Sequence, residues 1–379
     1  MDRKTILVVS PGIGIGGRER IALNTVRSFE ELGYRAVLVV FRKCETEYDY
    51  DGERIDLDEP PREGTAGKVR TQFARARKLR RLRKEYRPEC VYSLGEAANL
   101  SNVLSGIGAT GKTVVSLHGF AELGTGPLHR FVFRKADRVV CVAQEMQYRL
   151  KQLVPGLENT VVIENGYDLP EDGGGTAGRP GNGGPMRIAA MGRLNEVKGF
   201  DRLITSFSII RHAVPDAVLT IIGKGAREEK LKSLAAGLGL GDAVCFAGFV
   251  PDPVTVLRQQ NLFALTSYEE GFPNALIEAM SCGLPVVASD CTTGPREILS
   301  ETYSPDPVRG IRTEKYGVLV ENSDEGFEGR FSGSVLDLWN DPDRRAEYAG
   351  ACPRRAGDFS LEHYREKLKE LLDDPDDWK

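Results

Sequence analysis

The residues best suited to chemistry are two glutamates, Glu270 and Glu278, with seven residues between them. Glu270 precedes a Gly-Phe-Pro turn, and Glu278 lies within an apolar, helix-forming run. Pro273 suits the first turn of that helix, because this position needs no backbone N–H donor. The free N–H groups of a first helical turn can hold an anion. We therefore expect both carboxylates and the helix start to face one small volume, which would suit a phosphorylated sugar.

A second group of residues supplies positive charge. Arg193 and Lys198 lie in the segment 192–201, which follows a predicted strand and precedes a predicted helix. Two cations on a loop beside a helix start are well suited to binding a diphosphate.

The first half of the chain offers a glycine-rich loop and a histidine. The loop spans residues 11–20 and contains Gly16 and Gly17, where backbone N–H groups could approach a phosphate or a sugar closely. By itself this loop is a weak dinucleotide signal, because Glu45 comes slightly late for the acid that would bind a ribose. His118 follows another predicted strand, and it could face a ligand or serve only as a structural histidine.

Parallel sheets must position these residues. In each half of the chain, short apolar runs alternate with helical patterns, which is typical of βαβ units. The predicted strands span residues 6–9, 36–41, 91–93, 113–117, 139–142, 161–163, 188–191, 217–222, 244–246, 262–265 and 286–288. The predicted helices include residues 20–32, 145–153, 199–212, 227–238, 274–282 and 360–372.

The same alternation of strand and helix patterns, interrupted once, indicates the domain organisation. A glycine-rich stretch over 171–185 is typical of a flexible linker. We expect an α/β fold with two doubly wound domains over 1–170 and 186–358, followed by a final helix within 359–379.

Charge and composition exclude several classes of protein. The 379 residues carry a net charge of −4, so general nucleic-acid binding is not expected. Seven cysteines are scattered without a C-x-x-C pair, which argues against a disulfide framework or a structural zinc site. No apolar stretch reaches the ~20 residues of a membrane span, and the N-terminus indicates a strand rather than a signal peptide. We expect a cytoplasmic protein.

One segment is strongly basic. Residues 68–87 contain seven Arg and three Lys against one acid. A helical stripe that we expect to face the core consists of Val69, Phe73, Ala76, Leu79, Leu82 and Tyr86. The basic face could be merely solvated, or it could contact an anionic membrane or a polyprenyl diphosphate, at about 1 kcal/mol for each basic residue near such a surface.

The motifs together resemble one enzyme family. The pattern E-G-F-P-x-x-x-x-E-A-M-x-x-G-x-P-V-V, over residues 270–287, resembles the E-x7-E signature of retaining glycosyltransferases of the GT-B fold, family 4 (group 1). Residues 192–199 resemble the family's G-R-x-x-x-x-K-G motif, and residues 16–19 match its Gly-Gly-x-Glu loop. The resemblance implies two Rossmann-like domains facing across a cleft, with the acceptor domain first, the donor domain second and the last helix packed on the acceptor domain.

The resemblance also implies roles for single residues. Arg193 and Lys198 would hold the donor's phosphates, Glu270 would contact the sugar, Glu278 would bind the ribose, and His118 would lie against the donor sugar. Further donor-binding positions implied by the matching motifs are Gly16, Gly17, Gly223, Phe249, Gly271, Phe272, Pro273 and Asn274.

The implied activity is retaining transfer of a hexose or HexNAc from a UDP-sugar to a hydroxyl of a glycan or a polyprenyl-diphosphate-linked saccharide. Residues 289–299 resemble a subgroup that acts on lipid-linked or capsular glycans, which suggests the inner face of the plasma membrane. Because Arg193 and Lys198 could neutralise a leaving diphosphate, we expect no cofactor and no metal. The D-x-D triplet at residues 49–51 is interpreted as part of a charged surface loop.

Three alternatives remain open. An epimerase of the same fold would release UDP and an epimer without an acceptor. A non-catalytic sugar-nucleotide-binding protein would bind UDP without consuming UDP-sugar. An NAD-dependent oxidoreductase rests only on the loop at 12–17 and would change nicotinamide absorbance.

Overall fold

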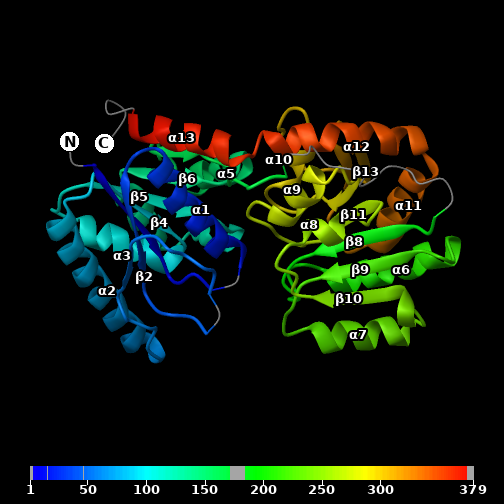
Figure 1. Ribbon diagram of the computed structural model, residues 1–379, viewed down its shortest axis with the longest axis horizontal. Coiled ribbons are helices and arrows are strands. Elements are labelled where there is room, and N and C mark those ends of the chain that lie inside the picture. Colours follow the sequence, from blue (N-terminus) through cyan, green and yellow to red (C-terminus); the bar gives the residue numbers. More distant parts are fainter. Residues whose placement is uncertain (1–2, 15, 46, 171–183, 374–379) are drawn as a thin grey trace. The chain divides into compact units, whose positions relative to one another are not determined.

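The computed structural model describes residues 3–14, 16–45, 47–170 and 184–373. Two compact units divide the chain (Figure 1): Met1–Gly166 with Leu361–Lys379, and Tyr167–Ser360. The final helix belongs to the first unit. The predicted linker at 171–185 lies, except for its last two residues, outside the described residues.

The first unit is built on a parallel sheet with strand order β3-β2-β1-β4-β5-β6-β7. Its strands are β1 (Thr5–Ser10), β2 (Arg35–Val40), β3 (Arg54–Asp56), β4 (Cys90–Leu94), β5 (Lys112–Leu117), β6 (Arg138–Cys141) and β7 (Thr160–Val162). Its helices are α1 (Gly17–Glu31), α2 (Gly64–Tyr86), α3 (Glu96–Gly106), the short 3-10 helix η1 (Phe120–Glu122), α4 (Pro127–Lys135), α5 (Gln144–Leu153) and α13 (Leu361–Asp373).

The second unit repeats this plan, with strand order β10-β9-β8-β11-β12-β14-β13. Its strands are β8 (Arg187–Met191), β9 (Val218–Ile222), β10 (Val244–Gly248), β11 (Leu262–Leu265), β12 (Val286–Ser289), β13 (Ile311–Glu314) and β14 (Gly317–Val320). Its helices are α6 (Phe200–Ala213), α7 (Glu228–Gly237), the 3-10 helix η2 (Gly241–Ala243), α8 (Val254–Leu257), α9 (Asn274–Ser281), α10 (Pro295–Leu299), α11 (Phe327–Asn340) and α12 (Pro342–Gly357).

The central strands of both sheets are buried on both faces, which explains their nearly continuous apolar sequences. In the first unit, Leu7, Val37 and Val91 of the sheet pack in one core cluster with Leu79 of α2 and Ala98 of α3. The strand order reverses between β1 and β4 and again between β8 and β11. Ligands of doubly wound sheets bind beyond the carboxyl ends of the strands at such points, so a ligand site is expected at the loops there.

The predicted α/β fold class is confirmed, with local exceptions. The three-residue strand β3 is partly exposed and has no apolar run that a pattern could reveal. β13 joins the second sheet antiparallel to β14, in a part of the chain where the sequence analysis predicted no strands. This pair is a hairpin joined by a short turn, so it needs none of the long crossovers that generate parallel pairing.

The prediction for the stripe on α2 was partly wrong. Ala76 and Leu79 are buried, but Val69 is 51% exposed and Phe73 is 64% exposed. Farther along α2, Arg83 is buried in the core and donates to Thr110, Gly111 and three side chains. Among the described helices, none combines the length and the apolar character that crossing a membrane would require.

Candidate active site

Four loops of the second unit meet beyond the carboxyl ends of β8, β9, β11 and β12. The loops after β8 and β9 touch through their backbones, since the N–H of Leu194 donates to the carbonyl oxygen of Lys224 over 3.0 Å. A Cβ on Gly223 would lie 1.9 Å from the carbonyl oxygen of Gly192, and Gly223 has a φ of +140°. Gly223 is therefore required because two loops pack closely there, which is a structural reason independent of any ligand.

The centre of this region is an ion pair between Lys198 and Glu270. Lys198 Nζ donates to the two carboxylate oxygens of Glu270 over 2.6 and 2.7 Å. Ser267 Oγ donates to Oε1 of the same carboxylate over 2.6 Å. The Glu270 side chain is only 7% exposed and that of Lys198 is 25% exposed, so the pair is largely withdrawn from water. Sequence reasoning placed both residues near a ligand but did not predict that they pair with each other.

Gly199 fixes the position of Lys198 on its loop. This glycine has a φ of +60° and immediately precedes α6, and a Cβ there would lie 2.1 Å from the carbonyl oxygen of Thr266. No other residue fits that contact without moving the backbone. The loop after β8 is thus pressed against the end of β11, which leads to Glu270.

Arg202 of α6 is a positioning residue that sequence reasoning missed. Its guanidinium donates to the carbonyl oxygens of Thr266 and Ser267 over 2.7 Å each. It lies 3.9 Å from the ring centroid of Tyr268 and 4.0 Å from that of Phe327. Burial lowers the pKa of Arg202, while nearby Tyr268 opposes part of that shift. This buried cation fixes the chain segment that leads to Glu270. The only signal in the sequence that could have indicated this role is the position of Arg202 one helical turn after Lys198.

The loop after β12 clamps the turn that carries Glu270. Thr293 Oγ1 donates to the backbone oxygen of Glu270, and the N–H of Glu270 donates to Thr292 over 3.3 Å. Gly294 has a φ of +93°, and a Cβ there would lie 2.3 Å from Cδ of Pro273. The clamp therefore depends on a residue without a side chain at position 294.

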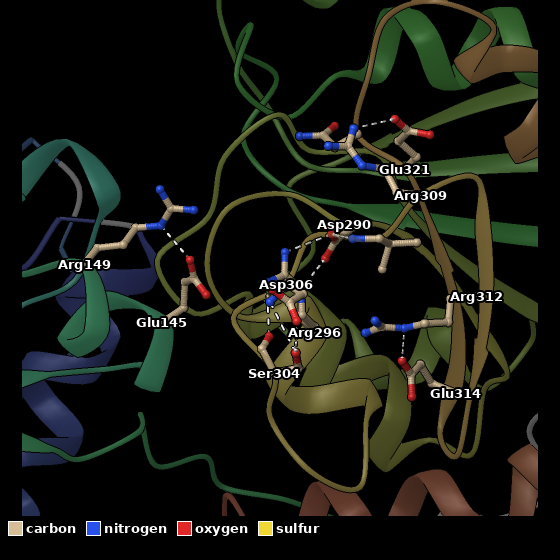
Figure 2. A network of polar contacts seen from close by, with 12 residues as sticks. Glu145, Arg149, Asp290, Arg296, Ser304, Asp306, Arg309, Arg312, Glu314 and Glu321 are labelled. Atoms are coloured by element: carbon tan, nitrogen blue, oxygen red, sulfur yellow. Dashed lines mark hydrogen bonds and ion pairs between the residues drawn. The ribbon is translucent and has the colours of Figure 1, made fainter. Parts of the chain in front are cut away.

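A buried ion pair stands behind this clamp (Figure 2). Arg296 Nε and Nη2 donate to the two carboxylate oxygens of Asp290 over 2.9 Å each. The backbone N–H of Val308 donates to the same carboxylate over 2.7 Å, and Arg296 also donates to the carbonyl of Ser304 over 3.2 Å. These bonds tie α10 and the chain after it to the end of β12, where the sequence had suggested only a subgroup resemblance.

Glu278 lies on α9, and it is 8% exposed. The helix begins at Asn274, one residue after Pro273, and the N–H groups of Leu276 and Ile277 reach back to the Pro273 carbonyl. Asn274 accepts a hydrogen bond from Tyr167 over 2.7 Å. The predicted helix start and helix carboxylate thus belong to the same element.

The remaining predicted positions of the second unit differ in exposure. Gly271, Phe272 and Pro273 form a buried turn, and the ring of Phe272 packs edge-on against Phe359 at a centroid distance of 5.2 Å. Arg193, on the loop after β8, and Phe249, after β10, are exposed to solvent. Two further positions, Gly16 and Gly17, lie in the first unit at the start of α1.

His118 also lies in the first unit, directly after β5. Its Nε2 lies 2.8 Å from Ser116 Oγ. Nδ1 is covered and has no hydrogen bond of good geometry, although Asn165 lies near enough to affect the ring. Burial, helped by the positive charge of Arg18, lowers the pKa of His118 to about 3. The imidazole is therefore neutral at physiological pH and can donate or accept one hydrogen bond at each nitrogen.

In the described part of the chain, no group of three or more His, Cys, Asp or Glu side chains is arranged to hold a metal ion. The described cysteines are all free thiols.

Comparison with known proteins agrees with this architecture. Residues 15–171 match the family model Glycosyltransferase Family 4, and residues 179–325 match Glycosyl transferases group 1. An uncharacterized glycosyltransferase of Methanocaldococcus jannaschii is 28% identical over 272 residues, which cover 65% of each chain.

A second relative has a named activity. The N-acetylgalactosamine-N,N'-diacetylbacillosaminyl-diphospho-undecaprenol 4-alpha-N-acetylgalactosaminyltransferase of Campylobacter jejuni is 31% identical over 186 residues, covering 49% of this chain and 46% of the relative. Each match thus spans less than two thirds of the relative's length.

Among solved structures, HepE of Anabaena in complex with UDP-glucose has a TM-score of 0.75 at 21% identity, covering 97% of this chain and 99% of that one. This similarity shows the fold. With both family models matched in order along two Rossmann-like units, the chain belongs to the group 1, family 4-like glycosyltransferases of the GT-B fold.

Proposed function

We propose that this protein transfers a sugar from a UDP-sugar to a hydroxyl of a glycan or a lipid-linked saccharide, with retention of anomeric configuration. The observation that carries the proposal is the buried pair of Lys198 and Glu270 on the loops that surround the start of α9. A cation, a carboxylate and a helix start in one water-poor region of the second unit fit an activated sugar with a diphosphate leaving group.

In this proposal, the cations of the site stabilise the leaving diphosphate. Lys198 and the exposed Arg193 would balance the charge that grows on the β-phosphate as the bond to the sugar breaks. Fixed charges that face a developing anion in a region poor in water are often a large part of catalysis. We propose that these groups do so without a divalent metal or other cofactor.

The two carboxylates have different partners in this proposal. Glu270 would contact the sugar and favour its oxocarbenium-like state, whereas Glu278 would accept hydrogen bonds from the ribose hydroxyls. In front-face retention, the bond from C1 to the diphosphate oxygen breaks while the acceptor oxygen bonds to C1 on the same face. The acceptor's proton passes to the departing phosphate, so no separate strong base is needed.

Relatives support the choice of substrates. HepE was solved with UDP-glucose, and the Campylobacter relative is named for moving N-acetylgalactosamine onto an undecaprenol diphosphate-linked saccharide. We infer a UDP-hexose or UDP-HexNAc donor, and an acceptor in the synthesis of lipopolysaccharide or another surface glycan.

Helix α2 supports a place at the membrane surface. Phe73 and Val69 are exposed near its N-terminal end, among the exposed cations Lys68, Arg70 and Arg77. Apolar side chains amid positive charge are typical of surfaces that bind anionic membranes peripherally. We propose that this helix contacts the cytoplasmic face of the plasma membrane, where a lipid-linked acceptor would be found.

The test is a screen of UDP- and GDP-sugars for nucleotide release, with and without lipid-diphosphate acceptors. Transfer from a UDP-sugar that depends on the acceptor, with an α product from an α donor by NMR, is expected. Release of UDP with an epimer and no acceptor would instead identify an epimerase, and UDP binding without consumption of any UDP-sugar would identify a binding protein. A product of inverted configuration would overturn the retaining mechanism.

A further inference from the structure

A second group of polar residues gathers at the carboxyl edge of the first unit's sheet. Arg18 comes from the start of α1, His118 from the end of β5, and Glu122 from η1. A Cβ on Gly95, at the end of β4, would lie 2.9 Å from Arg18 Nη1. The Arg18 side chain thus crosses the switch point between β1 and β4, where doubly wound sheets bind ligands.

Polar atoms of these side chains are covered but lack partners. Glu122 Oε2 and Arg18 Nε are buried without any hydrogen bond, whereas His118 interacts with the nearby Asn165. Buried polar atoms in folded proteins nearly always have a partner, and each unsatisfied one costs about 1–3 kcal/mol. Two such atoms of opposite hydrogen-bonding character on neighbouring residues indicate a site that a polar ligand completes.

The charges around the cluster select the class of ligand. Arg18 is the cation, but it already donates to Glu19 over 3.0 Å, and its charge acts on Glu122. Glu96 adds a further negative charge nearby, and the imidazole of His118 is neutral. A phosphate would meet more acids than cations here. Sugar hydroxyls, which donate to carboxylates and accept from guanidinium N–H groups, match the set of unpartnered atoms.

We propose that Arg18 and Glu122 bind hydroxyl groups of the acceptor's uncharged terminal sugar and determine which acceptor is used. This inference rests on the proposed glycosyltransferase function, and it narrows the acceptor to one that ends in a neutral sugar rather than in a phosphate.

Occupancy of this site depends on pH. Burial raises the pKa of Glu122 to about 7, whereas Arg18 and a backbone hydrogen bond from His118 lower it and Glu96 raises it further. His129 Nε2 lies 3.3 Å from the carboxylate of Glu96. A carboxylate accepts hydrogen bonds from hydroxyls better than a carboxylic acid does, so sugar binding strengthens as the pH rises through 7.

The experiment measures binding of methyl α-glycosides of glucose, galactose, GlcNAc and GalNAc by saturation-transfer NMR, with full-length protein and saturating UDP. We expect at least one glycoside to bind the wild type, with an affinity that increases from pH 6 to pH 8. We expect sn-glycerol 3-phosphate not to compete with it. Glu122→Gln and Arg18→Lys weaken this binding tenfold or more and leave UDP affinity unchanged, and Glu122→Gln also abolishes the pH dependence. The control is Glu158→Gln, an exposed acid of the first unit that lies outside this cluster and keeps the wild-type binding.

Three results would overturn the inference: no glycoside binding by the wild type, competition by the phosphate, or wild-type binding in Glu122→Gln. Failure of the proposed function is seen separately, as absence of UDP-sugar consumption by the wild type in the donor screen. Wild-type transfer activity with unaltered acceptor KM in Glu122→Gln would contradict the hydroxyl site alone.

Discussion

Lys198 and Glu270 neutralise each other in the free protein. Because Nζ already donates to both carboxylate oxygens, the proposed diphosphate would have to share that cation with Glu270. Glu270 also keeps a hydrogen bond from Ser267, so it stays oriented if Lys198 turns toward a phosphate. In the proposed function, a charge held in this way would face the leaving group while being only partly exposed to water.

Lys198→Ala is expected to lower kcat by roughly 10²–10³-fold, the usual cost of removing one group that stabilises a developing anion. Acceptor KM should change much less, because the lost contact lies with the donor. The measurement is steady-state kinetics with the UDP-sugar found in the screen. Lys230→Ala, an exposed lysine on α7, is the matched control. Wild-type turnover in Lys198→Ala would count heavily against the role.

Glu278→Ala should act mainly on donor binding, since the proposed partners of Glu278 are the ribose hydroxyls. We expect a donor KM raised by about tenfold or more, consistent with ~1.5–3 kcal/mol for hydrogen bonds to a charged group. Donor titration at saturating acceptor checks this. An unchanged donor KM would remove the ribose assignment.

Glu122→Gln should stabilise the ligand-free protein at high pH. The pKa of Glu122 is raised from 4.5 to about 7, so the native state binds this proton more tightly than the unfolded state. Its contribution to stability is therefore full below pH 4.5, falls as the pH rises to 7, and is constant above. We expect the variant to be more stable at pH 8 by roughly 1–3 kcal/mol, allowing for partial solvent screening, and nearly equal at pH 4.5.

Thermal unfolding at the two pH values measures this difference. Glu158→Gln provides the comparison, with no pH-dependent gain expected from this exposed carboxylate. Equal stability of Glu122→Gln and the wild type at pH 8 would contradict the assignment. The same reasoning assigns any change of activity with pH near 7 to Glu122, whose pKa is about 7. His118 is not the group responsible, because its pKa is lowered to about 3 and it stays neutral through that range.

At the scale of elements, loops that pack on one another hold the site together. The β12 loop grips the Glu270 turn through Thr293 and Gly294, and Arg202 of α6 holds the strand end before it. Thr293 itself has a φ of +65°, a conformation that costs a non-glycine residue of order 1 kcal/mol. Such strain persists because the surrounding contacts define the loop.

Gly294→Ala should disturb this clamp. The new Cβ would meet Cδ of Pro273 and would sit at a φ of +93°, so the turn under Glu270 must shift. We expect kcat to fall at least tenfold and stability to fall by about 1–3 kcal/mol. Gly333→Ala in α11 is the control, because its Cβ meets nothing within 4 Å and should stabilise the helix by about 0.5–1 kcal/mol. Kinetics and thermal unfolding of both variants separate the outcomes.

At the scale of the whole molecule, each unit has its own sheet and core, and the chain crosses between the units twice, after Gly166 and after Ser360. The chain segments at the two crossings pair with each other. The N–H of Tyr167 donates to the carbonyl oxygen of Phe359 over 3.0 Å, and Tyr167 and Ser360 form an isolated parallel β-bridge. In the first unit, α13 packs on α1, where Tyr364 Oη lies 2.7 Å from Thr25 Oγ1. The chain thus closes the first unit only after the second is complete.

The membrane proposal also belongs to this scale. Phe73→Ser should reduce binding to vesicles of phosphatidylglycerol and phosphatidylcholine by about 10–100-fold, because burying a Phe side chain is worth about 1.5–3 kcal/mol. Binding should weaken at high salt and be absent on neutral vesicles. Ile209→Ser, an exposed apolar position in the second unit, should bind like the wild type in co-sedimentation. Equal binding of Phe73→Ser would argue against this surface.

The sequence alone determined the fold class and singled out Lys198 and Glu270, which pair with each other in the second unit. Apolar runs with helical patterns between them specify parallel βαβ units, because buried parallel strands are apolar on both faces. Glu270, Glu278 and Lys198 were visible because each belongs to a local motif whose spacing reflects a turn and a helix start. The exposed position of Phe73 and the antiparallel β13 were not visible, since neither departs from the patterns of its neighbours.

Only the tertiary structure decided which groups touch. The pairing of Lys198 with Glu270, the hold of Arg202 on the β11 end and the Thr293 clamp join residues that are distant in sequence. The unpartnered Oε2 of Glu122 arises in the same way, from loops after different strands covering one side chain. Periodicity reports what one element buries, whereas hydrogen-bond partners and desolvation depend on elements that meet only when the chain has folded.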